Sequence, residues 1–248
     1  MRDPNKKENS PVSASDVCHR AFELMAAKQY ADAEKLVSGN MSRTDDDASI
    51  ALYHSVLGVL FKLQGEYKTA WKHYQRAEKL LPKDPALKII SARLLIEQFA
   101  EYEQAIKKAK KVLEIIPENP VFAHQAHTTI GLALLKKGDR RKALSHFKKS
   151  WGDDFKGFVS GKNIDFTLLE VLVRRGYGLK ECRQFLAKAL AFVEDAGDES
   201  YIKLVGAMIE AFERENPEFA EVPLPARAVP KTAPETSDDD TKEEVIEQ

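Results

Sequence analysis

The pattern of small and large apolar residues repeats along residues 14–151. Gly58 lies seven residues before Gly65, and Ala70 and Tyr74 follow that second glycine by five and nine residues. The same intervals recur farther along the chain, at Gly131, Gly138, Ala143 and Phe147. Neighbouring apolar residues are mostly three or four positions apart, which is the spacing of one face of an α-helix. The pattern therefore predicts a series of similar helical units.

Helix boundaries are marked by two linkers that are near copies, 81–85 (LPKDP) and 116–120 (IPENP). In each linker one proline ends a helix, Asp84 or Asn119 can cap the next helix, and a second proline occupies its first position. Each unit is therefore predicted to consist of two helices. Only small residues fit where two helices cross closely, and the crossing positions carry Ala21, Ala33, Gly58, Ala70, Ala105, Gly131 and Ala143. Since a lone helix pair cannot bury its apolar face, such units stack into a solenoid.

These positions resemble the tetratricopeptide repeat, whose consensus pattern is W-x2-L-G-x2-Y, then A-x3-F, then P over 34 residues. The resemblance is strongest at 51–84, and the four units lie near 14–47, 51–84, 86–119 and 124–153. The slot that the family fills with tryptophan holds Val17, His54, Ile89 and His127. The resemblance implies an all-α, right-handed superhelical solenoid that binds protein or peptide partners in its concave groove.

After Trp151 the residues match the repeat pattern less closely. We predict a long connection, a fifth and divergent helix pair, and a last helix that caps the stack, at residues 153–163, 164–195 and 199–214. The solenoid is then predicted to span 14–215. Residues 1–13 and 216–248 are predicted to be disordered. The segment 216–248 is Pro-rich and then acidic, with too few apolar residues to fold.

Composition narrows the class of protein. The 248 residues include no uninterrupted apolar stretch of the 18 or so residues that a membrane span needs, and no apolar run near Met1 that could act as a secretory signal. We therefore expect a cytoplasmic protein without membrane insertion. Cys18 and Cys182 form no paired motif and are expected to be reduced thiols. The chain carries no phosphate-binding loop, zinc-protease motif or hydrolase elbow, so neither enzymatic activity nor a cofactor is predicted.

Three histidines offer an alternative, a metal site. His124 and His127 lie three residues apart on one predicted helix, and His146 lies on its partner helix. Zinc sites commonly use such histidines. However, His127 falls in a packing slot of the repeat, and no cysteine or carboxylate completes the set. Packing roles are favoured, and no metal is predicted.

Charge is unevenly distributed along the chain. Residues 235–248 carry seven acidic residues and one basic residue, a net charge of −6, so residues 1–234 carry −1 − (−6) = +5. Lysines and arginines cluster at 107–111 and 136–149. These clusters could bind nucleic-acid phosphates, which gives an alternative function as a nucleic-acid-associated factor. The other interpretation is a solvated outer face, which is favoured because no aromatic residues interleave with the clusters to stack on bases.

In this family the concave groove is lined by positions 2, 5, 9, 12 and 13 of the first helix in each unit. The groove residues predicted on this basis are Cys18, Phe22, Met25, Ser55, Val59, Lys62, Leu87, Ile90, Leu94, Gln125, Thr128 and Leu132. Positions 2 and 13 of the second unit add Leu52 and Leu63. Apolar side chains dominate this set, and an exposed apolar strip marks a binding site. An apolar peptide or amphipathic helix is the expected partner.

Relatives that hold the acidic C-terminal peptides of heat-shock chaperones present Lys and Asn at positions 5 and 9. Here those positions hold Cys18 and Phe22, Ser55 and Val59, or Ile90 and Leu94, so a carboxylate clamp is not expected. We predict a non-catalytic protein-binding scaffold or chaperone-like adaptor. A regulatory subunit of an enzyme complex is a further alternative. The apolar residues of the C-terminal tail are a candidate internal occupant of the groove.

Overall fold

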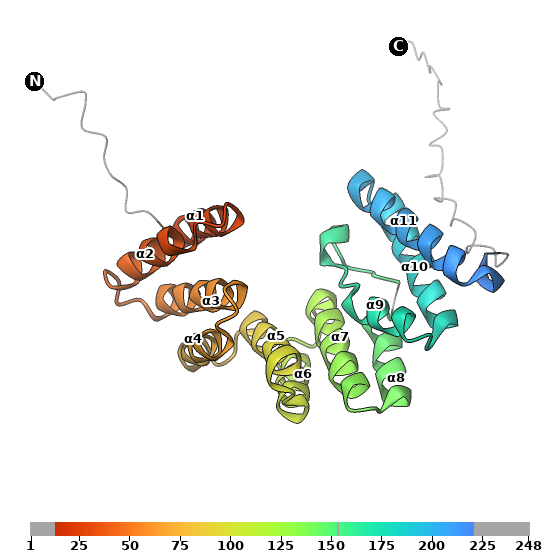
Figure 1. The fold of residues 1–248 in the computed structure, drawn as a ribbon, viewed down its shortest axis with the longest axis horizontal. Helices are drawn as coiled ribbons and strands as arrows, with labels where there is room; N and C mark the ends of the chain where they lie inside the picture. The colour runs from red at the N-terminus through yellow and green to blue at the C-terminus, as the bar shows by residue number, and fades with distance from the viewer. Residues whose placement is uncertain (1–12, 153, 221–248) are drawn as a thin grey trace, which may run out of the picture.

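The computed structural model describes residues 13–152 and 154–220, and within them it contains eleven α-helices and no strand. The helices follow a curved path, so the molecule is an arch with α1 at one end and α11 at the other (Figure 1). In chain order the helices are α1 (Ala14–Ala26), α2 (Tyr30–Met41), α3 (Asp47–Leu63), α4 (Tyr67–Leu80), α5 (Pro85–Leu94), α6 (Tyr102–Ile115), α7 (Pro120–Lys136), α8 (Arg140–Ser150), α9 (Thr167–Arg174), α10 (Leu179–Asp195) and α11 (Glu199–Glu215). A π-helix (Leu95–Phe99) and two 3-10 turns, Gly161–Asn163 and Pro217–Phe219, complete the structure.

The predicted all-α solenoid is confirmed. Helices pack in consecutive pairs, and the second helix of each of the first three pairs also contacts the first helix of the next. In the first four pairs the first helix lies on the inner side of the arch and the second on the outer side (Figure 1). None of the described helices is both long and apolar enough to cross a lipid bilayer.

Helix starts follow the capping signals in the sequence. The Asp84 carboxylate accepts a hydrogen bond from the backbone N–H of Leu87 at 2.8 Å, and the Asn119 side chain accepts one from Phe122 at 3.1 Å. The prolines after both caps occupy the first helical position. Each such cap contributes about 1 kcal/mol by satisfying an N–H that the helix leaves free. These caps fix where the inner helices α5 and α7 begin.

Small residues set the distance between paired helices. A Cβ atom added to Gly58 would lie 2.2 Å from Cε1 of Tyr74 on the partner helix α4. One added to Gly131 would lie 3.4 Å from the carbonyl oxygen of Ala143 on the partner helix α8, and 2.3 Å from Cδ2 of Leu168 on the later helix α9. The predicted crossing alanines of the second helices, Ala33, Ala70, Ala105 and Ala143, are all fully buried. Close helix approach therefore depends on the small residues that the repeat pattern places there.

The apolar core changes character at the junction between α4 and α5. One cluster of buried side chains joins α1, α2 and α3, and a larger one runs from α5 to α11. Between them, Glu78 of α4 binds Lys108 of α6 at 2.7 Å and also accepts from the Ser91 hydroxyl of α5. On α3, Lys62 pairs with Glu97 at 2.7 Å. Polar contacts thus supplement smaller apolar clusters in joining the two parts of the arch.

The described chain extends slightly beyond the predicted limits of the solenoid. The Ser13 hydroxyl caps α1 by accepting from the backbone N–H of Asp16 at 3.1 Å. After α11, the Phe219 ring packs on Phe212 with ring centroids 5.6 Å apart, so residues 216–220 belong to the folded part rather than to the tail. The rest of the segments predicted to be disordered, 1–12 and 221–248, lies outside the described residues.

Candidate protein-binding surface

The residues predicted to line the groove lie on the inner helices α1, α3, α5 and α7, and the structure divides them into two groups. Those that keep exposed surface are Phe22, Ser55, Val59, Lys62, Ile90 and Gln125. Those that are buried are Cys18, Met25, Leu87, Leu94, Thr128 and Leu132. The buried residues cannot contact a partner unless the helices separate, so the predicted groove needs correction at these positions.

Cys18 and Met25 pack against the neighbouring unit. Both belong to the apolar cluster that α1 shares with α3, which includes Tyr53 and Leu57. Burial raises the pKa of the Cys18 thiol to about 11. The thiol is therefore protonated at neutral pH and is neither a groove contact nor an activated nucleophile.

The third unit has one residue more between its crossing residue and its second helix than the repeat spacing of the second unit. Its buried crossing residue, Ala92, precedes the start of the second helix at Tyr102 by 102 − 92 = 10 residues, whereas Gly58 precedes Tyr67 by 67 − 58 = 9. The π-helix Leu95–Phe99 accommodates the extra residue, because its backbone bonds span five residues rather than four. The sequence positions assigned to the groove in α5 are consequently displaced by one.

The displacement explains two of the buried residues. The position directly after the crossing residue holds Phe22 in α1 and Val59 in α3, and in α5 it holds Arg93 rather than Leu94. Leu94 packs instead in a cluster with Ala70 and Tyr74 of α4, and Leu87 packs with Ala51 and Ala77. Both leucines therefore join α5 to the preceding unit.

Thr128 and Leu132 are buried because α7 is surrounded on all sides. This helix contacts α5, α6, α8 and α9, and the segment that precedes α9 also reaches it. α9 and that segment lie beyond the recognisable repeats, so the repeat pattern does not predict that they cover α7. In this unit only Gln125 of the predicted residues stays accessible.

What remains on the inner side is an apolar stripe near the N-terminal end of the arch. Phe22, Leu52 and Leu63 are large apolar side chains with 46%, 38% and 56% of their surface exposed. Leu52, Val59 and Leu63 are seven and four residues apart, so they follow one face of α3. We refer to Phe22, Leu52, Val59 and Leu63 as the inner apolar stripe. Both helices that carry it pack against each other.

A polar network that the sequence did not indicate anchors the segment before α9. Arg93 of α5 pairs with Asp165, and the side chains of both residues are mostly buried. The backbone N–H of Asp165 donates to Nε2 of His124 at 2.7 Å, while Nδ1–H of His124 donates to the carbonyl of Ser150 at 2.7 Å. Nε2 can accept this bond only when the ring is neutral, and burial lowers the pKa of His124 to about 4, so this histidine has a structural role.

Asp165→Asn is expected to lower the free energy of unfolding by about 1–3 kcal/mol, because it leaves the Arg93 charge desolvated and unpaired. Asparagine keeps the side-chain oxygen that accepts from Thr167 at 3.0 Å, so the local turn is preserved. The effect is measured by urea denaturation. As a control, Asp154→Asn breaks the exposed pair with Lys188 and is expected to cost at most about 1 kcal/mol. Equal losses of unfolding free energy in both variants would show that the Arg93 pair stabilises the fold no more than an exposed ion pair does.

Histidine pairs join the two helices of the second and fourth units in the same way. The Nδ1 atoms of His54 and His73 are 3.0 Å apart, and those of His127 and His146 repeat this distance. One ring donates and the other accepts, so at least one ring in each pair is neutral. Desolvation by burial is the main cause that lowers the pKa of all four, to about 4 for His73 and His127. His124 joins neither pair, and residues 13–152 and 154–220 contain no cluster of three potential metal ligands.

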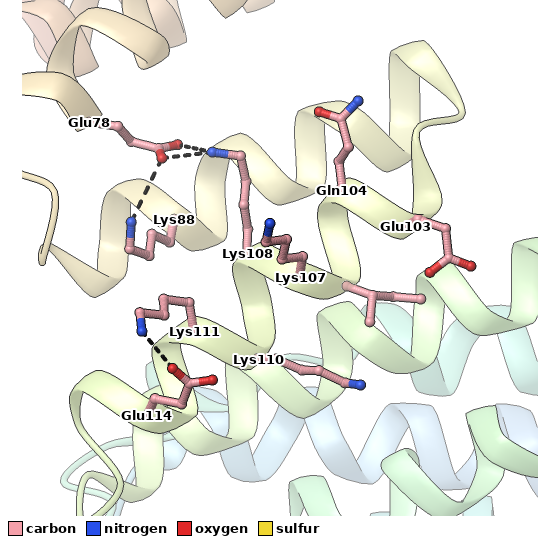
Figure 2. A pocket seen from close by; sticks show the side chains of 10 residues that line it. Glu78, Lys88, Glu103, Gln104, Lys107, Lys108, Lys110, Lys111 and Glu114 are labelled. Carbon is pink, nitrogen blue, oxygen red and sulfur yellow. Dashed lines mark hydrogen bonds and ion pairs between the residues drawn. The ribbon is translucent and has the colours of Figure 1, made fainter.

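The side of the arch formed by α4, α5 and α6 is hollowed by a shallow groove of about 820 Å³. Its lining includes five lysines, and Figure 2 shows that Glu78 and Glu114 form ion pairs with some of them. Glu78 lies 2.7 Å from Nζ of Lys108 and 3.9 Å from Nζ of Lys88, and Glu114 pairs with Lys111 at 2.6 Å. The groove is therefore partly neutralised by its own carboxylates.

Comparisons with known proteins support the fold. No protein-family model matches the chain, and no curated protein matches it in sequence. Among solved structures, BtubC (BKLC) from P. vanneervenii is 14% identical and matches 94% of this chain and 87% of its own, with a TM-score of 0.55. Two crystal structures of MamA are 24% identical and cover 59% and 58% of this chain and 75% and 79% of theirs, each with a TM-score of 0.47. The likeness to BtubC extends over nearly the whole helical array.

Proposed function

We propose that this protein is a non-catalytic interaction scaffold that binds an apolar segment of a partner protein along the inner apolar stripe. The observation that carries the proposal is the exposure of Phe22, Leu52 and Leu63 on adjacent helices that line the inside of the arch. Large apolar side chains grouped on one surface favour burial against a partner, which contributes about 1.5–3 kcal/mol for each side chain fully removed from water.

The chemistry of the stripe favours the apolar face of an amphipathic helix over an acidic peptide. The only charged side chain among the accessible groove residues is Lys62, and its ammonium group is paired with Glu97. No Lys and Asn pair stands at the positions where relatives of the repeat family clamp a carboxylate. An amphipathic helix can place apolar residues against Phe22 and along α3 while its polar face stays in water.

The proposal predicts that Phe22→Ser combined with Leu63→Ser will abolish capture of the main partner from native lysate. Both residues are exposed, so the far-ultraviolet circular dichroism spectrum and the urea midpoint are expected to match the parent protein. Leu204→Ser is the matched control, because Leu204 is equally exposed, at 46%, on the distant helix α11. Capture that survives the double change but not the control substitution would place the binding surface elsewhere.

The same capture separates the scaffold from a nucleic-acid-associated factor, the alternative that the exposed lysines of α6 and α8 favour. Nucleic-acid contacts weaken steeply with salt because binding releases counterions. Partners retained after nuclease treatment and at high salt support the scaffold. Partners lost under both treatments, with the Phe22 and Leu63 variant still active, support nucleic-acid association.

A further inference from the structure

The outer helices α6 and α8 carry more positive charge than the surrounding carboxylates neutralise. Among their basic side chains, Lys108, Lys111, Lys142 and Lys148 each have a carboxylate within 4.0 Å. Within residues 13–152 and 154–220, no carboxylate lies within that distance of Lys107, Lys110, Arg141 or Lys149, and all four are exposed. We refer to these last four residues as the outer basic surface.

α6 and α8 both pack against α7 and lie on the outer side of the arch, so they present these charges on neighbouring surfaces (Figure 1). Lys110 of α6 and Lys149 of α8 both act on His146, where each contributes to lowering the pKa of the imidazole. Grooves flank the region on both helices, one of about 820 Å³ beside α6 and one of about 540 Å³ along α8. Each groove contains an aliphatic side chain among the charges, Ile106 in the first and Leu144 in the second. The surface therefore combines positive charge with small apolar patches.

We infer that the outer basic surface is a docking site for an acidic segment that also carries aliphatic residues, and that its occupant is this chain's own segment 235–247. That segment holds seven acidic residues against one lysine, a net charge of −6, and includes the adjacent pair Val245 and Ile246. Charge and aliphatic content both complement the surface. Nucleic acid would offer phosphates but fits less well, because none of the residues that line the two grooves is aromatic and able to stack on bases.

The connection is long enough for this contact. Residues 221–234 separate the last described residue from the acidic segment, and 14 residues span at most about 46–50 Å at 3.3–3.6 Å each. α11 packs on α10, and Glu181 of α10 lies 3.8 Å from Lys148 of α8. Two helix spacings of about 8–10 Å therefore separate the axes of α11 and α8, and two more through α7 lead from α8 to α6, at most about 40 Å in all. Tethering by a short linker also supplies an effective concentration of about millimolar, so a weak contact is enough to be populated.

Zero-length carbodiimide cross-linking of the full chain, read by mass spectrometry, tests the inference. At low salt, carboxylates of 235–247 are expected to couple to Lys107, Lys110 and Lys149. These cross-links should disappear at 1 M salt, where the screening length falls to about 3 Å. Lys110→Glu with Lys149→Glu should abolish coupling to Lys107 also, whereas Lys68→Glu with Lys72→Glu, two exposed lysines on α4, should leave it unchanged.

Further outcomes decide whether the contact is specific and intramolecular. Val245→Ser with Ile246→Ser should reduce the cross-links although every charge is retained, because the aliphatic contact is lost. Equal coupling to Lys68 and Lys72 would overturn the inference, as would cross-links that form only between isotope-labelled and unlabelled copies. Absence of tail cross-links, together with binding of a labelled 20-nucleotide oligothymidine that the Lys110 and Lys149 changes abolish, would assign the surface to nucleic acid instead.

Discussion

Gly58→Val is expected to destabilise the protein by about 3 kcal/mol or more, the upper end of the range for overpacked cores. Its Cβ would lie 2.2 Å from Cε1 of Tyr74, and that ring is only 2% exposed. The ring has no free space to enter, so α3 and α4 must move apart. Because the pair also supports α1 and α5, the loss should appear as a lower midpoint in urea denaturation followed by circular dichroism.

The matched control is Gly206→Val on α11, where a Cβ meets nothing within 4 Å. Both glycines lie inside helices, and valine and glycine differ in helix propensity by only a few tenths of a kcal/mol. We therefore expect the control to change stability by no more than about 0.5 kcal/mol. Similar midpoints for the two variants would mean that α3 and α4 do not cross closely at Gly58.

Stability is expected to fall steeply between about pH 6.5 and pH 4. The pKa values of His54, His73, His124, His127 and His146 are all lowered, mainly by burial. The unfolded chain, in which a histidine has a pKa near 6.5, then binds more protons than the folded one below that pH, and linkage favours unfolding. At pH 5 a buried histidine such as His124 costs about 1.5 × 1.4, or roughly 2 kcal/mol.

Urea denaturation at pH 7.5, 6.5, 5.5 and 5.0 measures this dependence. The exposed carboxyls with lowered pKa values, Glu23, Asp46 and Asp139, lose their contribution only below their unfolded pKa values near 4, so they act at the lower edge of this range. His73→Gln keeps hydrogen-bonding capacity without titration and should flatten the profile. A constant free energy of unfolding from pH 7.5 to 5.0 would contradict the neutral histidine pairs.

The sequence predicts the helix pairs well because their signals are local. Asp84 and Asn119 mark helix starts by bonding to an N–H three residues on, and a crossing residue such as Gly58 must be small where its helix approaches the partner helix. Both requirements act within one repeat unit. The repeat pattern therefore predicts the helix starts and the crossing residues without knowledge of the rest of the chain.

The groove was harder to predict because accessibility depends on distant parts of the chain. A single extra residue, absorbed by the π-helix Leu95–Phe99, moved Leu94 from the inner side into the contact with α4. Thr128 and Leu132 were covered by elements beyond the recognisable repeats. The large apolar side chains that stay exposed as the pattern indicates lie on α1 and α3, and on the later inner helices only Ile90 and Gln125 of the predicted residues keep exposed surface.

The most direct test of the scaffold account is photo-cross-linking in native lysate. A benzoyl-phenylalanine residue is placed either at position 22, on the inner apolar stripe, or at position 204, which has the same 46% exposure on α11. The account predicts one dominant covalent adduct with a protein partner from position 22, lost in the presence of Leu63→Ser, and no comparable adduct from position 204. Equal adducts from both positions, or an adduct from position 204 alone, would contradict binding on the inner side of the arch.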